Sequence, residues 1–147
     1  YLYFDNKQDL VDSLYLETKS SFTDAAFTDH DPEGAVKQEF KRIWKNMAAY
    51  KMNHVQEALF LAQCDNSPII TEKVRDKGLE HLQPLLNLWE RGRSQNMLQD
   101  VSPYLFYGYA IYPISFFAAV KDRDEFHLSE EMFQQAFEMA WNAIKAK

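Results

Sequence analysis

Residues 102–120 restrict the possible folds of this chain more than any other stretch. They read SPYLFYGYAIYPISFFAAV and carry no charged side chain. In a helix, these residues would cover the whole circumference with apolar and aromatic groups, and such a helix has to be covered on every side. We therefore expect this helix to pack into its own domain on one side and against a second subunit on the other.

A membrane-spanning role is the weaker interpretation of the same stretch. A spanning helix needs about 20 apolar residues, a length that the stretch just reaches, but it contains tyrosines, a glycine and an internal proline. The mean hydropathy of the chain is −0.47, which is strongly polar. The single cysteine, Cys64, suits a reducing compartment. We therefore expect a cytoplasmic protein that makes no contact with a membrane.

Length and charge limit the class of protein further. The chain has 147 residues, which is enough for one domain, and 46% of them are hydrophobic, which is ample for a core. Its net charge of −6 opposes nonspecific binding to nucleic acid by the chain as a whole, because phosphate binding needs a basic surface. A small DNA-contacting end remains compatible with this charge.

The spacing of apolar residues predicts an all-α bundle of six helices and no strand. Residues that are expected to cap the beginning of a helix are Asn6 with Asp9, Asp31 before Pro32, and Ser129. Pro84 and Pro113 lie inside predicted helices, where a proline causes a kink or a break. The expected helices cover about 7–27, 32–51, 54–63, 68–91, 102–120 and 129–144.

The first ten residues carry a motif, Tyr1-x-Tyr3-Phe4-x-Asn6-Lys7-x-Asp9-Leu10. It resembles the end of the DNA-binding region of TetR-family transcriptional regulators, where Tyr-x-(His/Tyr)-Phe-x-(Ser/Asn)-Lys-x-x-Leu leads into the first helix of the regulatory domain. The resemblance implies that residues 1–6 are the residual end of an N-terminal helix-turn-helix domain. Residues 7–147 would then form an effector-binding and dimerisation domain.

The same resemblance implies a function and partners. The family's members are ligand-responsive DNA-binding transcriptional regulators, most often repressors, and they act as homodimers. Their last two helices form a four-helix bundle in the dimer, and the preceding helices surround an effector pocket. Because the family's three-helix DNA-binding unit lies before the motif, we expect operator DNA to be bound through residues outside this chain.

By resemblance, Tyr1, Tyr3 and Lys7 are expected to contact DNA phosphates. A tyrosine hydroxyl can donate to a phosphate oxygen, and Lys7 lies in the first turn of its helix, where the helix dipole favours an anion. The alternative for the two tyrosines is ordinary packing against neighbouring side chains.

An excess of aromatic residues on the predicted helices suggests a pocket for a small apolar or aromatic effector. Such a pocket would also tolerate a cation, because aromatic faces and an acid such as Glu57 attract positive charge. Packing in the core is the alternative for each residue taken singly. The candidate ligand-binding residues are Phe22, Phe40, Trp44, Met47, Phe60, Gln63, Trp89, Phe106, Tyr109 and Tyr112.

The last two helices carry the residues that we expect at a dimer interface. Packing between these two helices within one chain is the alternative for each of them. The candidate interface residues are Phe116, Phe117, Phe133, Phe137 and Trp141.

Catalytic and metal-binding patterns are weak in this sequence. The four histidines are scattered, and neither a His-Glu-x-x-His spacing nor a cysteine pair for zinc is present. We therefore predict no enzyme activity, no cofactor and no metal. A helical dimeric adaptor without a small-molecule effector remains the main alternative, and an all-α enzyme is the least supported one.

Overall fold

A computed structural model describes residues 4–123 and 125–147, and this part of the chain contains helices and no strand. The prediction of an all-α fold is thus confirmed. The helices are α1 (Lys7–Ala26), α2 (Val36–Asn53), α3 (Val55–Asp65), α4 (Glu72–Glu80), α5 (Gln83–Ser94), α6 (Pro103–Phe106), the π-helical turn η1 (Tyr107–Ile111), α7 (Pro113–Val120) and α8 (Glu130–Ile144).

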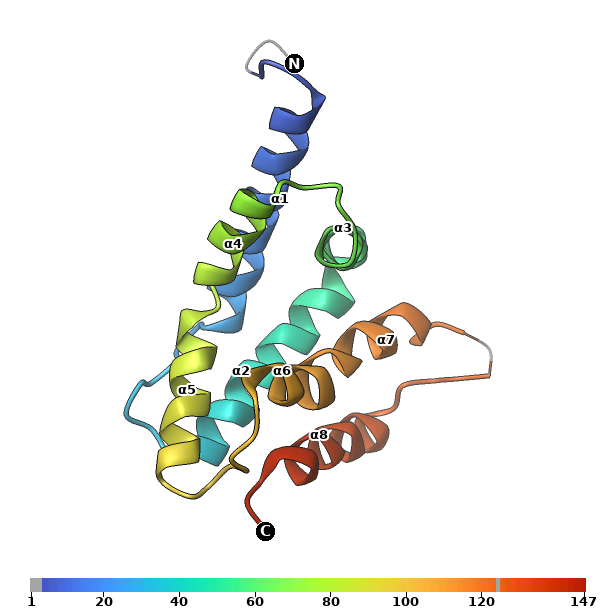
Figure 1. Cartoon of the computed structure of the whole chain (residues 1–147). Helices are drawn as coiled ribbons and strands as arrows, with labels where there is room; N and C mark the ends of the chain where they lie inside the picture. Colours follow the sequence, from blue (N-terminus) through green and yellow to red (C-terminus); the bar gives the residue numbers. More distant parts are fainter. Residues whose placement is uncertain (1–3, 124) are drawn as a thin grey trace.

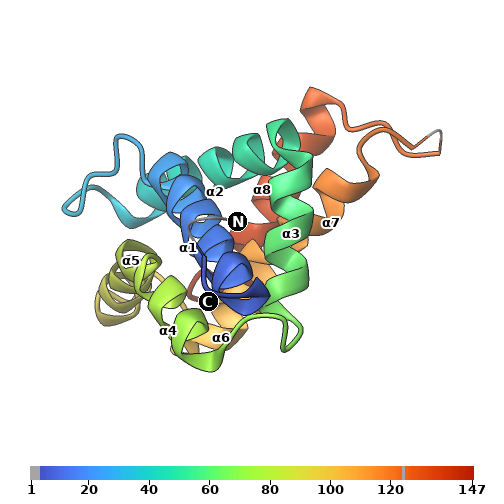
Figure 2. The same cartoon turned by 90° about the horizontal axis from the view of Figure 1, so that it is seen from above.

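Two long helices, α1 and α2, pack on each other and organise the fold (Figure 1). Helices α4 and α5 run along one side of this pair, and α3 lies against α1 on the other side (Figure 2). The segment α6–η1–α7 packs on α2, and α8 closes the far end against η1. None of the described helices combines the length and the apolar character that crossing a membrane requires.

Side-chain caps fix where several helices begin. The Asn6 side chain accepts a hydrogen bond from the backbone N–H of Asp9 at 2.8 Å, and Ser129 does the same for Met132 at 3.1 Å. Each cap satisfies a backbone donor that has no partner within its helix. The sequence predicts both caps, and the structure confirms them.

The predicted start of the second helix at Asp31–Pro32 was wrong, because α2 begins only at Val36. The Asp31 carboxylate accepts from the N–H of Glu33 and holds a turn instead of a helix. Glu39, in the first turn of α2, reaches back to this turn. Its carboxylate accepts from the Asp31 N–H at 2.8 Å and lies 3.0 Å from Nδ1 of His30.

The two internal prolines have different consequences. The helix predicted over 68–91 begins later and is broken, because α4 ends at Glu80 and α5 starts anew at Gln83. Pro84 occupies the first turn of α5, where its missing N–H leaves no bond unmade. Before Pro113, the chain keeps its helical course but widens into the π-helical turn η1.

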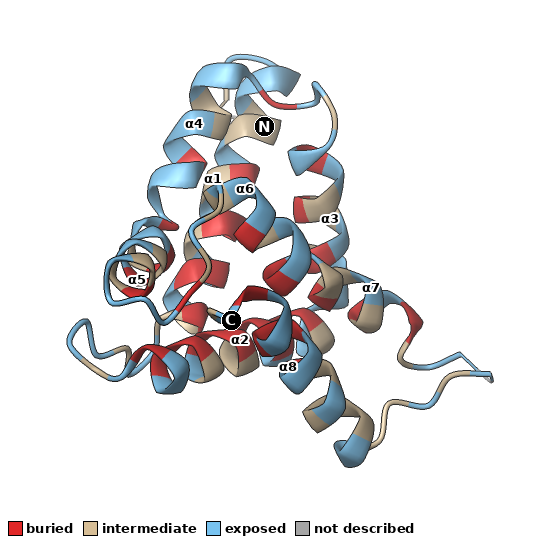
Figure 3. Cartoon of the chain, turned by 60° about the horizontal axis from the view of Figure 1, so that its bottom comes forward, coloured by how far each residue is buried: buried red, intermediate tan, exposed pale blue. Residues whose placement is uncertain are grey.

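The stretch 102–120 divides into an inner and an outer face. Phe106, Ala110, Ile111 and Ile114 are buried in the core. Figure 3 shows buried and exposed positions alternating along α6 and α7. A second set of side chains at helical spacing is exposed, and we call it the outer stripe. It consists of Leu105, Tyr109, Tyr112 and Phe116.

An aromatic cluster joins α8 to α2. The ring of Phe137 lies 5.8 Å from that of Phe40 and 5.5 Å from that of Trp44, and Trp141 lies 5.9 Å from Phe40. The indole N–H of Trp44 donates to the carbonyl oxygen of Ala110 at 3.0 Å, which ties α2 to η1 as well. These contacts fix η1 and α7 relative to α2, and so they position one wall of the cavity described next.

Candidate functional site

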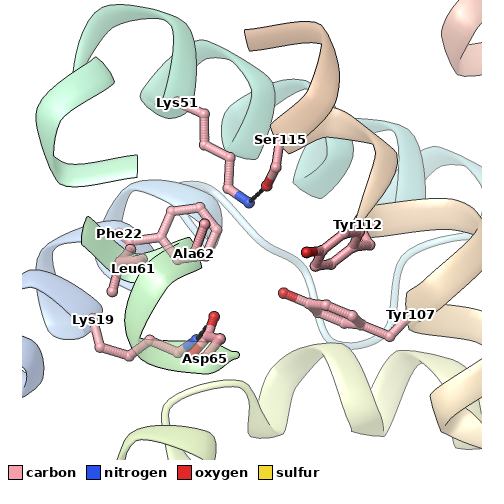
Figure 4. A pocket seen from close by; sticks show the side chains of 9 residues that line it. All are labelled: Lys19, Phe22, Lys51, Leu61, Ala62, Asp65, Tyr107, Tyr112 and Ser115. Atoms are coloured by element: carbon pink, nitrogen blue, oxygen red, sulfur yellow. Dashed lines mark hydrogen bonds and ion pairs between the residues drawn. The ribbon is translucent and has the colours of Figure 1, made fainter. Parts of the chain in front are cut away.

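A small cavity lies where α1, α2 and α3 meet η1 and α7 (Figure 4). Its volume is about 10 Å³, which is room for about one water molecule. Five secondary-structure elements therefore contribute to one partly open space. The lining residues are Lys19, Phe22, Lys51, Leu61, Ala62, Asp65, Tyr107, Tyr112 and Ser115.

Two buried lysines dominate the chemistry of the cavity. Lys19 of α1 is 2% exposed and Lys51 of α2 is 7% exposed. The Lys51 Nζ donates to Oγ of Ser115 at 2.7 Å, and the Lys19 Nζ lies 3.9 Å from Oδ2 of Asp65. Both ammonium groups also lie over the ring of Phe22, at 5.2 Å for Lys51 and 6.0 Å for Lys19.

Burial makes the charged forms of these lysines costly. Burial, helped by the positive charge of Lys19, lowers the pKa of Lys51 from its ordinary 10.5 to about 8, and Asp65 only partly opposes this. Burial also lowers the pKa of Lys19, with Asp65 again acting in the opposite direction. A pKa of about 8 leaves most of the Lys51 side chains protonated at neutral pH.

Two tyrosines form the wall opposite the lysines (Figure 4). Burial and the nearby charge of Asp65 raise the pKa of Tyr107, so its hydroxyl stays a neutral donor. Tyr112 is half exposed, and its hydroxyl accepts one hydrogen bond, from the Asn66 side chain at 3.1 Å. One such bond contributes about 0.5–1.5 kcal/mol, so the hydroxyl of Tyr112 is held only weakly at the rim of the cavity.

Of the ten predicted ligand-binding residues, the structure brings Phe22 and Tyr112 to this cavity. Four others are packed in the core and do not line it, namely Phe40, Trp44, Met47 and Phe106. Phe60 and Trp89 are partly buried against that core, while Gln63 and Tyr109 are exposed. Apolar periodicity identifies the inward face of a helix, but an inward residue can meet another side chain instead of open space.

Sequence reasoning missed the polar lining of the cavity. Lys51 follows Met47 by one helical turn, and Lys19 precedes Phe22 by three residues, so both lie on the inward faces of their helices. A lysine on an apolar face was the signal that could have revealed the site. The structure also does not bring Glu57, the acid expected beside a cationic effector, to the lining.

The predicted interface residues divide in a similar way. Phe116 is 62% exposed, and Phe117, which contacts its ring, is half buried. Phe133 packs against Trp44 at 5.3 Å. Phe137, at 0% exposed, and Trp141, at 6%, have almost no surface left for a second subunit.

Of the predicted DNA-phosphate contacts, Lys7 is exposed in the first turn of α1. Tyr1 and Tyr3 lie outside the described residues. Across the described part of the chain, no three histidine, cysteine or carboxylate side chains come together in a way that could hold a metal ion.

The fold is that of known transcription regulators. A TetR-family transcription regulator from Marinobacter aquaeolei VT8 superimposes with a TM-score of 0.90 at 20% identity, covering 100% of this chain and 77% of that one. A TetR-family transcriptional regulator from Haemophilus influenzae Rd gives a TM-score of 0.81 at 19% identity, covering 99% of this chain and 76% of that one. At these identities the similarity establishes the fold. No curated protein matches the chain in sequence.

A match in sequence establishes the family. The family model described as "Tetracyclin repressor-like, C-terminal domain" matches residues 35–145, which is most of the chain. The chain belongs to the TetR family of transcription regulators.

Proposed function

We propose that this chain is the effector-binding and dimerisation region of a ligand-responsive, DNA-binding transcriptional repressor. In this proposal, residues 1–6 are the end of a helix-turn-helix domain and residues 7–147 form the regulatory domain of a cytoplasmic protein. The observation that carries the proposal is the position of the cavity against α1. Lys19 and Phe22 of this helix line the cavity, and Lys7, the proposed phosphate contact, begins the same helix.

Helix α1 is the element that would transmit ligand binding to DNA. Its 20 residues span about 30 Å, so a small tilt at Phe22 produces a larger displacement at Lys7. A ligand in the cavity separates α1 from the wall formed by Tyr107 and Tyr112. If the ligand binds better to a conformation whose two DNA-binding domains are wrongly spaced for the grooves of the operator, it increases the population of that conformation.

DNA binding by the full-length protein, including any residues encoded before Tyr1, tests this function. The probe is a labelled duplex that covers the DNA upstream of the protein's own gene, and the readout is fluorescence anisotropy at several salt concentrations. We expect salt-dependent binding, and we expect Lys7→Ala to reduce the slope of log affinity against log salt by about 1. Lys73→Ala, at an exposed site on α4, is the control. Absence of specific binding to this DNA would overturn the proposal.

We further propose that the protein is a homodimer and that the outer stripe is covered by the second subunit. Its members Tyr109 and Phe116 are 67% and 62% exposed. Exposed apolar side chains that recur on one helix face usually mark an interface. Met139, on the neighbouring α8, is exposed as well. Gly108 lies between Leu105 and Tyr112 on this face, and a Cβ there would meet nothing within 4 Å, so a partner can approach closely.

Replacing Phe116 by aspartate should therefore produce a folded monomer. A charge in a buried apolar interface has no partner, whereas in the monomer it is solvated. Size-exclusion chromatography with light scattering gives the mass, and far-ultraviolet circular dichroism reports the helix content. Leu79→Asp, at an exposed leucine of α4 outside the outer stripe, should remain a dimer. A Phe116→Asp protein that is still a dimer at micromolar concentration would rule out this interface.

A further inference from the structure

We propose that the effector carries one oxyanion group, a carboxylate or a phosphate, on a small apolar body, and that this group binds between the side chains of Lys19 and Lys51. The inference rests on the proposed function and adds the chemical class of the ligand. It keeps the apolar body of the predicted effector and disfavours a cationic one, because the charges that face the cavity are mainly positive.

The lining of the cavity contains more basic than acidic side chains, which favours an anionic ligand. Among the described lining residues, Lys19 and Lys51 supply two ammonium groups and Asp65 supplies the one carboxylate. Asp65 lies 3.9 Å from the ammonium group of Lys19, whereas the hydrogen-bond partner of Lys51 is the neutral hydroxyl of Ser115. Buried charges are stable only when they are paired. An anion would supply the pairing that Lys51 lacks.

The surroundings of Asp65 strengthen this argument. The Tyr15 hydroxyl donates to Oδ1 of Asp65 at 3.4 Å, so this carboxylate is shared between Lys19 and a tyrosine. The Arg75 guanidinium lies nearby and donates to the backbone carbonyls of Cys64 and Ser67. Because Asp65 is engaged by Lys19 and by Tyr15, it does not serve Lys51 as a hydrogen-bonded partner.

The arrangement of donors matches an oxyanion. In Figure 4, the side chains of Lys51, Tyr107 and Tyr112 point towards a common space from opposite walls. Ammonium and hydroxyl groups are donors, and hydrogen bonds to an ionised oxygen are stronger than neutral ones. Phe22, Leu61 and Ala62 supply an apolar surface beside these donors. A ligand with an acidic end and an apolar body satisfies both parts of the lining.

Entry of the ligand requires the rim to open, because the cavity holds only about 10 Å³. Tyr112 is the residue that can open it. It is half exposed, and a single hydrogen bond from Asn66 holds its hydroxyl. Tyr112 also belongs to the outer stripe, so a ligand that displaces it also changes the surface proposed for the second subunit.

Four aromatic probes of similar size and different charge test the class of ligand. Benzoate and phenyl phosphate are the anions, benzyl alcohol is neutral, and benzylamine is a cation at pH 7. The thermal melting temperature of the full-length protein is measured with each probe. At ten times its Kd, a ligand that binds the folded protein raises the melting temperature by about 3–5 °C. We expect this shift from an anion and none from benzylamine, and the two anions distinguish a carboxylate site from a phosphate site.

Two variants test the location. Lys51→Met and Lys19→Met remove one charge each and keep most of the volume, so each should abolish the shift caused by the anion. Lys73→Met, at an exposed site on α4, should leave it unchanged. In the wild-type protein the affinity for the anion should fall by about tenfold per pH unit above 8, because Lys51 loses its proton there.

Several outcomes would overturn the inference. An equal or larger shift with benzylamine or benzyl alcohol would show that the ligand class is wrong. A shift that survives both lysine substitutions would show that the anion binds elsewhere, and no shift with either anion would also reject the class. None of these outcomes depends on DNA binding. The melting experiment therefore tests the class of ligand, and the anisotropy experiment tests the proposed function independently.

Discussion

Replacing Phe137 by alanine is expected to lower the free energy of unfolding by about 3–5 kcal/mol. The side chain is fully buried, and its ring contacts those of Phe40 and Trp44 on α2. Lys41 also places its ammonium group 5.5 Å from the Phe137 ring. Removal of the ring leaves a cavity between α8 and α2, which the surrounding rings fill only in part. Urea denaturation followed by far-ultraviolet circular dichroism measures the loss.

This experiment separates two roles for Phe137, the core and the dimer interface. Leu79→Ala, at an exposed position of α4, should change the free energy of unfolding by less than about 0.5 kcal/mol and is the control. A Phe137→Ala protein that dissociates into monomers while its monomer keeps wild-type stability would contradict the core assignment. Such a result would instead favour the interface that the sequence suggested.

Replacing Lys51 by methionine is expected to raise the free energy of unfolding at pH 7 by about 2–3 kcal/mol. The pKa of Lys51 falls from 10.5 to about 8 on folding, and each pKa unit corresponds to about 1.4 kcal/mol. Methionine removes the buried charge and retains the length of the side chain. The loss of the hydrogen bond to Ser115 offsets part of the gain. Replacement of buried charges by apolar side chains is stabilising in other proteins for the same reason.

The stability difference between Lys51→Met and the wild-type protein should depend on pH. Between pH 8 and 10.5 the unfolded chain keeps a proton on Lys51 that the folded protein has released, so the wild-type protein gains stability from this group as the pH rises. The advantage of Lys51→Met is therefore largest below pH 8 and disappears by about pH 10.5. Lys73→Met, which removes an exposed charge, is the control. If Lys51→Met were less stable than the wild type at pH 7, and if the difference did not change with pH, burial of the Lys51 charge would not destabilise the folded protein.

Much of the fold could be predicted because local signals and packing agree. Asn6 and Ser129 cap their helices as expected, and helical periodicity without strand patterns gave the correct fold class. The start of α2 could not be predicted in the same way. Asp31 followed by proline is a good start signal in isolation, but Glu39, eight residues further on, binds the Asp31 N–H and stabilises a turn. A contact between a loop and the helix after it is not visible in local sequence patterns.

The candidate site was predicted less well, and the reason is physical. Aromatic residues at helical spacing fill the core and line pockets equally well, so Phe22 and Phe40 could not be distinguished from the sequence. Only the relative placement of α1, α2 and η1 decides that Phe22 meets a cavity and Phe40 meets other rings. The two lysines indicate the site more clearly than the aromatic residues do. An ammonium group on an apolar helix face costs free energy unless it is paired.

The proposed control of DNA binding by the cavity between α1 and η1 can be tested in one measurement. It is the affinity of the full-length protein for the DNA upstream of its own gene, by fluorescence anisotropy, with and without an anion that raises the melting temperature through Lys51. We expect the anion to weaken DNA binding at least tenfold in the wild-type protein and to leave the Lys51→Met protein bound to DNA. If an anion bound the cavity and left the DNA affinity of the wild-type protein unchanged, the cavity would not control DNA binding.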